Sequence, residues 1–136
     1  MTSLITIKNS FKNADIIELE YKNKCDIRTF QNLETELEYI KNNQSKFDRI
    51  VFINEDAIIP FMYFSKQKGI VAAAIYDEHS AMMTPSHNNT KIMCLGYEIS
   101  TPTLLNSMIS LYLSTPYEGA RHKSRIDMLD AELERE

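Results

Sequence analysis

The chain has little cysteine, no excess of basic residues and no long apolar run, and each absence excludes a class of protein. Cys25 and Cys94 lie far apart and match no metal-ligand spacing, so we expect free thiols in a reducing cytoplasm and no bound metal. A formal net charge of -4 argues against nucleic-acid binding, which requires basic residues to meet the phosphate backbone. The apolar runs are far shorter than the ~20 residues of a membrane span, and no secretory leader is recognisable before residue 20, so we expect no membrane attachment.

The remaining composition is that of an ordinary globular protein. Of the 136 residues, 43% are hydrophobic and 25% are charged, which are usual values for a water-soluble domain. No repeat, low-complexity tract or linker divides the chain. We therefore predict one domain, residues 1–136, with a single core.

Segments typical of strands and of helices alternate along the chain. Short apolar runs predict strands at residues 4–7, 16–19, 49–53, 71–75 and 92–95. Helical periodicity and capping residues predict helices at 29–42, 60–69, 77–85, 101–115 and from about 118 toward the C-terminus. This alternation favours an α/β sandwich with a mostly parallel sheet.

Two expectations concern the first forty residues. Only residues 8–15 separate the first two predicted strands, which is too short for the helical crossover that parallel strands require. We therefore expect an antiparallel or missing strand and no helix between Ile7 and Ile16. In the helix predicted at 29–42, the apolar stripe leaves out Glu34, Glu36 and Glu38, which we interpret as a solvated face.

Two groups of polar residues in the C-terminal half suggest chemistry. His87 is followed by Asn88 and Asn89, and we expect all three on a short loop because the preceding proline should end its helix. Arg121 and Arg125 lie four residues apart near the start of the last helix, so both guanidinium groups leave one helical face. Two such groups fit the oxygens of a phosphate, and a neutral imidazole can move a proton near pH 7. The pattern predicts a sugar-phosphate or nucleotide-phosphate site.

Each of these residues also has a simpler interpretation. A histidine like His87 without its neighbours is more often a surface residue, and Arg125 could form a solvated ion pair of little energetic value. His122 points about 100° away from Arg121 around a helix. Ligands of parallel sheets bind beyond the carboxyl ends of the strands. The segment with His87 precedes a strand, so it reaches that edge only through its helix or from a neighbouring subunit.

Short motifs occur in order between about Arg49 and Leu129. They lie at residues 60–62, 68–73, 77–81, 87–89, 95–96, 117–122 and 125–129, and include His87-Asn88-Asn89 and Gly119-Ala120-Arg121-His122. This part of the chain resembles the ribose-5-phosphate isomerase B family of sugar-phosphate isomerases. Within that family it is most similar to the A subunits of galactose-6-phosphate isomerases.

The resemblance implies a fold and a reaction. The fold is a Rossmann-like three-layer αβα sandwich, in an oligomer whose active sites cross the subunit interface and whose C-terminal helix packs on a partner subunit. The apolar residues Ile126, Leu129 and Leu133 on an otherwise charged helix agree with that packing. The reaction is the cofactor-free conversion of D-galactose 6-phosphate to D-tagatose 6-phosphate through an enediol, in lactose and galactose breakdown.

The resemblance also implies roles for individual residues. His87 matches the histidine that assists ring opening, and Asn88 matches the asparagine that contacts sugar oxygens. Arg121 and Arg125 match the pair that holds the phosphate, with His122 beside them.

The N-terminal half departs from the family. Asn54 stands where active members have a cysteine base, and an amide cannot accept a carbon-bound proton near pH 7. Residues 55–59 contain no glycine, whereas the family uses a glycine-rich loop there to hold the enediolate. Lys8-Asn9-Ser10 replaces the first loop, and we expect the first helix to be missing and the N-terminal part truncated.

Two functions follow from these departures. In the first, the chain is inactive alone and supplies a histidine/arginine half-site to a homologous, cysteine-bearing subunit. In the second, it is a catalytically inactive homologue that binds a sugar phosphate or acts as a structural or regulatory subunit.

Overall fold

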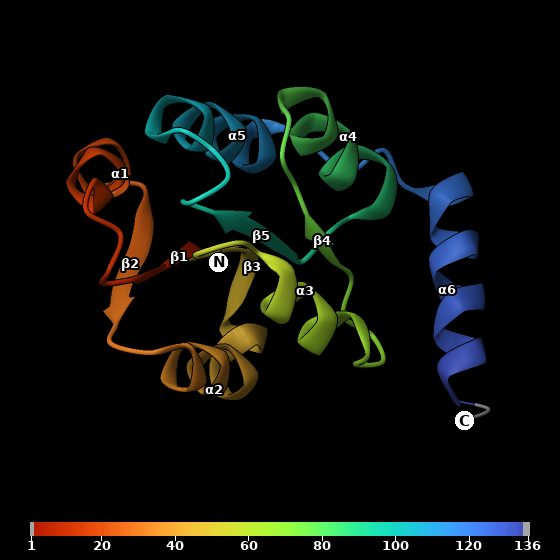
Figure 1. The fold of residues 1–136 in the computed structure, drawn as a ribbon. Coiled ribbons are helices and arrows are strands. Elements are labelled where there is room, and N and C mark those ends of the chain that lie inside the picture. The colour runs from red at the N-terminus through yellow and green to blue at the C-terminus, as the bar shows by residue number, and fades with distance from the viewer. Residues whose placement is uncertain (1, 135–136) are drawn as a thin grey trace.

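The computed structural model describes residues 2–134, apart from the side chains of residues 120–122 and 134. A five-stranded sheet with the order β2-β1-β3-β5-β4 lies at its centre (Figure 1). The strands are β1 (Thr2–Lys8), β2 (Cys25–Phe30), β3 (Phe47–Asn54), β4 (Ala72–Ala74) and β5 (Ile92–Gly96). All neighbouring strands pair in parallel, which confirms the predicted α/β class.

Helices cover both faces of the sheet. They are α1 (Ala14–Tyr21), α2 (Leu33–Asn43), α3 (Ile58–Ser65), α4 (Glu78–Asn88), α5 (Pro102–Ser114) and α6 (Ala120–Glu134). Helices α2 and α3 lie on one face and α1, α4 and α5 on the other, while α6 stands to one side of the body (Figure 1). Among the described residues, no helix is both long enough and apolar enough to cross a membrane.

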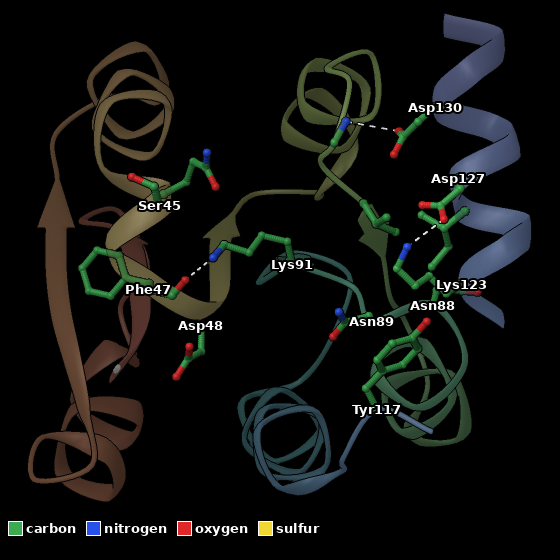
Figure 2. Close-up of a pocket in the computed structure, with 14 residues that line it drawn as sticks. Ser45, Phe47, Asp48, Asn88, Asn89, Lys91, Tyr117, Lys123, Asp127 and Asp130 are labelled. Carbon is green, nitrogen blue, oxygen red and sulfur yellow. Dashed lines mark hydrogen bonds and ion pairs between the residues drawn. The ribbon is translucent and has the colours of Figure 1, made fainter. Parts of the chain in front are cut away.

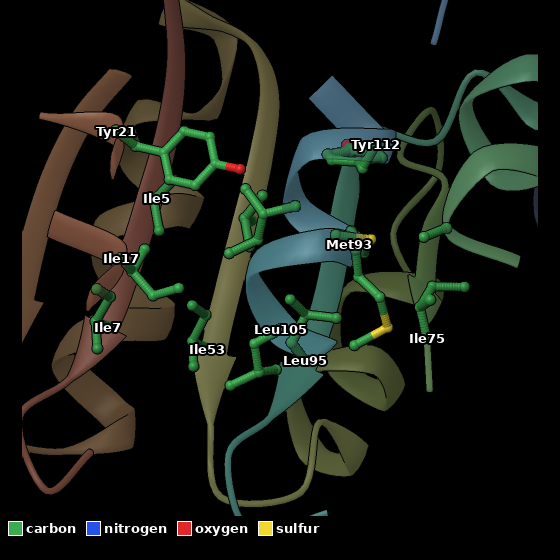
Figure 3. Close-up of a cluster of buried hydrophobic side chains, with 14 of the residues drawn as sticks. Ile5, Ile7, Ile17, Tyr21, Ile53, Ile75, Met93, Leu95, Leu105 and Tyr112 are labelled. Carbon is green, nitrogen blue, oxygen red and sulfur yellow. The ribbon is translucent and has the colours of Figure 1, made fainter. Parts of the chain in front are cut away.

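Alternating residues of the strands supply the two halves of the core. Ile5, Val51 and Met93 pack against α1 and α5 (Figure 3), whereas Phe52 and Cys94 pack against α2 and α3. This two-sided burial follows from the period of two along a strand, and it explains why the central strands read as continuous apolar runs.

The expected N-terminal arrangement is wrong. Residues 16–19, predicted as a strand, belong to helix α1, where Ile17 and Tyr21 are buried one helical turn apart. The second strand is Cys25–Phe30, parallel to β1, so residues 9–24 hold a complete helical crossover and the N-terminal part is not truncated. A four-residue apolar run does not distinguish a strand from a short helix, and β2 lacked a signal because it is a partly exposed edge strand.

Two further expectations along the chain are corrected. Helix α2 begins at Leu33 after the cap Asn32, four residues later than predicted, and Glu36 is fully buried instead of solvated. Pro85 does not end α4, because the N–H of Asn89 closes the last turn by donating to the Pro85 carbonyl, at 3.2 Å.

Other predicted features are confirmed. Asp77 and Thr101 cap α4 and α5 by accepting hydrogen bonds from backbone N–H groups. Both cysteines are free, and burial raises the pKa of the Cys94 thiol, which makes it unreactive.

Candidate functional site

His87 and Asn88 lie in the last turn of α4, not on a loop. His87 is half-buried and Asn88 is exposed. Asn89 follows in the left-handed conformation with φ of 49°, which asparagine tolerates better than most residues, and turns the chain toward β5. The imidazole and the amide therefore stand on a rigid helix end.

A cavity of about 460 Å³ opens beside this helix end (Figure 2). Asn88, Asn89 and Tyr117 line it together with Lys91 and Lys123. Phe47 and Val71, which begin or precede strands, complete the wall, so the cavity lies at the amino-terminal edge of the sheet. The carboxylates of Asp48, Asp127 and Asp130 also line it, so the cavity is polar and carries charges of both signs.

Helix α6 lies along the far side of the cavity. The Asp130 carboxylate accepts a hydrogen bond from the Gly69 N–H at 3.1 Å, and Lys123 forms an ion pair with Asp127 at 2.8 Å. Arg121 and Arg125 both fall within α6, as predicted, and Arg125 is exposed. The side chains of Arg121 and His122 lie outside the described part of the structure.

The opposite edge of the sheet carries Asn54, whose side chain is occupied by its own loop. Asn54 is 3% exposed, and its Oδ1 accepts a hydrogen bond of 2.8 Å from the Ala57 N–H. The next N–H, from Ile58, donates to the Asp56 carboxylate at 3.0 Å. Two donors that could stabilise an oxyanion are thus already bonded within the chain.

Charged and aromatic side chains fill the rest of this edge. Lys8 forms an ion pair with Glu55, which lowers the pKa of the Glu55 carboxyl and raises that of the Lys8 ammonium. Phe11 and Tyr97 stack with ring centroids 5.1 Å apart. No local sequence pattern predicts these contacts, because they join residues distant along the chain.

The backbone locks this loop in place. The N–H of Tyr97 donates to the Asn54 carbonyl and that of Glu98 to the Glu55 carbonyl, both at 2.9 Å. Gly96 makes this approach possible, since a Cβ there would lie 2.7 Å from the Asp56 Cα. Backbone hydrogen bonds therefore fix the loop after β3 to the segment that follows β5.

The two predicted groups of site residues do not meet within one chain. Asn54 ends β3 at the carboxyl edge, whereas Asn88 lies beside Phe47 and Lys91 at the amino edge. The structure brings the end of α4 together with α6, and leaves Asn54 apart from both. Among the described residues, no cluster of three or more His, Cys, Asp and Glu side chains could hold a metal ion.

Two buried polar groups near these edges escaped the sequence prediction. The Tyr117 hydroxyl, in the wall of the cavity, is buried without a hydrogen-bond partner among the described residues. Glu36 is buried on α2 near Lys8 and Glu55. Tyr117 belongs to the motif at residues 117–122, but nothing in the sequence distinguishes Glu36 from the other glutamates of its helix.

Known proteins resemble this chain in sequence and in fold. The model of the ribose/galactose isomerase family matches residues 7–129. Galactose-6-phosphate isomerase subunit LacA 2 of Streptococcus pyogenes is 38% identical over 106 residues, covering 77% of this chain and 73% of that protein. Subunit LacA of Clostridium acetobutylicum is 32% identical over 127 residues, covering 93% and 88%.

Solved structures agree with the fold over the whole chain. Ribose-5-phosphate isomerase B of Mycoplasma genitalium, solved with bound ribulose-5-phosphate, has a TM-score of 0.78 at 21% identity and covers 100% of this chain and 99% of its own. The Clostridium thermocellum enzyme has a TM-score of 0.81 at 20% identity, with 99% of each chain covered. The family model and the sequence relatives together show that this chain belongs to the ribose/galactose isomerase family.

Proposed function

We propose that this chain is an A-type subunit of a galactose-6-phosphate isomerase that supplies the histidine/arginine half of an inter-subunit site. The relatives above carry that subunit name, which supports the substrate class. The observation that carries the half-site is the hydrogen bond from the Ala57 N–H to Asn54. Because of this bond, the residue at the position of the expected base has a structural role, so the base must come from another subunit.

In the proposed reaction, a cysteine of the partner removes the proton from C2 of the open-chain aldose. The electron pair forms the enediolate, the hydroxyl proton passes from O2 to O1, and return of the carbon-bound proton at C1 produces the ketose. His87 assists ring opening, Asn88 contacts sugar oxygens, and Arg121 and Arg125 hold the phosphate, with His122 beside them. No cofactor takes part.

The surface of the chain suits assembly with a homologous subunit. Met128 and Leu129 on α6 are 59% and 62% exposed, and Ile59 and Met62 on α3 are 53% and 51% exposed. Large apolar side chains exposed on the surface are typical of an interface. We propose the cytoplasm as the site of action, since that is where sugar phosphates are metabolised and thiols stay reduced.

The test is an isomerase assay on the chain alone and on its complex with a cysteine-bearing homologue. The chain alone should be inactive and the complex active. His87→Ala and Arg125→Ala should each lower the rate tens- to hundreds-fold, which corresponds to about 2–4 kcal/mol of lost transition-state stabilisation. Arg28→Ala removes an exposed arginine on β2 that pairs with Asp26, and serves as the matched control.

Equal rates for the unsubstituted complex and for one carrying both site substitutions would contradict the half-site. The chain would then be a catalytically inactive scaffold or regulatory subunit.

A further inference from the structure

A buried hydrogen-bond network lies behind the end of α4. Tyr112 on α5 is fully buried, and its hydroxyl lies 2.7 Å from the Thr90 carbonyl and 2.9 Å from that of Lys91. Burial raises the pKa of the Tyr112 hydroxyl, so it remains a donor throughout the working range of pH. Its proton thus holds the segment that leaves α4 for β5.

The same segment is tied back to α4 by two threonines. The Thr90 hydroxyl donates to the Thr84 carbonyl at 3.0 Å. The Thr84 hydroxyl, 2.6 Å from the Thr90 oxygen, must then be the donor of that second bond, because the Thr90 proton is already used. Thr84 lies one turn before His87, so these bonds hold the turn that carries the imidazole.

Arg49 connects this network to the segment that leads into α6. Its guanidinium donates to the carbonyls of Tyr112, at 2.5 Å, and Thr115, at 2.6 Å, and lies 5.5 Å from the Tyr112 ring centroid. A few residues later, the Glu118 N–H donates to the carbonyl of Ser86 at 2.9 Å. The segment that leads into α6 is therefore hydrogen-bonded to the residue before His87.

We infer that Tyr112 and Arg49 are positioning residues that set the spacing between the His87–Asn88 turn and the phosphate-binding start of α6. This inference rests on the proposed function. Neither side chain touches the cavity of Figure 2, so both act through the backbone of the elements that they join. An aldose–ketose isomerase requires this spacing because the imidazole and the phosphate grip must engage one substrate at once.

The chain offers a matched pair of variants. Tyr112→Phe removes the hydroxyl of the network. Tyr21→Phe removes another buried tyrosine hydroxyl, on α1, that also donates to a carbonyl, that of Asn106 at 3.2 Å. In the mixed complex, Tyr112→Phe should lower kcat about tenfold with a smaller change in KM, while Tyr21→Phe stays within about twofold.

A second measurement does not need activity. In the isolated chain, Tyr112→Phe should speed hydrogen exchange at the Asn89 and Glu118 amides more than Tyr21→Phe does. If Tyr112→Phe fails to fold, Thr90→Val, which keeps the side-chain shape, takes its place in both measurements.

The outcomes separate this inference from the proposed function. A kcat equal to that of Tyr21→Phe would overturn the positioning role, even with faster exchange. Unchanged exchange at Asn89 and Glu118 would overturn the network itself. An inactive complex of the unsubstituted chains would count against the proposed function, and the exchange measurement would then decide the network alone.

Discussion

The buried carboxyl of Glu36 predicts that this protein loses stability as pH rises. Glu36 is 0% exposed, and neither of its oxygens has a hydrogen-bond partner among the described residues. Burial raises the pKa of the Glu36 carboxyl from 4.5 to about 8. The nearby Thr6 hydroxyl lowers this pKa, the Glu55 charge raises it, and the Lys8 charge lowers it. The Cys94 thiol also faces this carboxyl from β5.

The sign and size follow from proton linkage. Between pH 4.5 and about 8, the folded chain keeps the Glu36 proton and the unfolded chain releases it. The stabilisation is fully present below pH 4.5 and disappears as pH rises through about 8. The difference of these pKa values at about 1.4 kcal/mol per pKa unit amounts to roughly 5 kcal/mol, an upper bound because water reaching the opened site would reduce it.

Urea unfolding at pH 5, 7 and 9 measures this effect. The unsubstituted chain should lose several kcal/mol across the series, a large fraction of a typical domain's stability. Glu36→Gln should lose most of that pH dependence, because the amide stays neutral. The matched control is Glu38→Gln on the exposed face of the same helix, which should keep it. An identical pH slope for Glu36→Gln and the unsubstituted chain would refute the buried-acid argument.

Three further outcomes concern the loop after β3. Asn54→Ala should destabilise the fold by about 1–3 kcal/mol in urea unfolding, since the buried Ala57 N–H loses its acceptor; a neutral result would mean that water replaces the amide. Asn54→Cys should leave the isolated chain without isomerase activity, because the Ile58 N–H remains bonded to the Asp56 carboxylate, and measurable turnover would contradict this view. Gly96→Ala should cost about 1–3 kcal/mol through its clash with the Asp56 backbone, measured as a lowered unfolding midpoint, and an unchanged midpoint would show that the loop can move away.

Local sequence signals were enough for much of the C-terminal half. The apolar runs of β3 and β5 are long and buried on both faces, and Asp77 and Thr101 cap their helices through bonds to residues three positions ahead. Such features depend on neighbours in the sequence, so the chain itself contains them. The motifs around His87 and Arg125 likewise pointed to the family that the comparisons confirm.

The features that the sequence did not predict depend on packing between residues that are distant along the chain. Ile17 and Tyr21 form a helix because α5 and the sheet bury one side of it, and Glu36 is buried because α2 closes over β1. The ion pair of Lys8 with Glu55 joins residues 47 positions apart. No local pattern encodes such contacts.

The separation of Asn54 from the end of α4 has the same origin. Parallel strands place every carboxyl end at one edge, so Asn54 and the end of α4 are held at opposite edges by the direction of the chain. The residue types predicted a phosphate site, and the family resemblance predicted a missing base. Their placement on opposite edges of one rigid sheet is a property of the folded molecule, because it depends on which strands pair and in which direction.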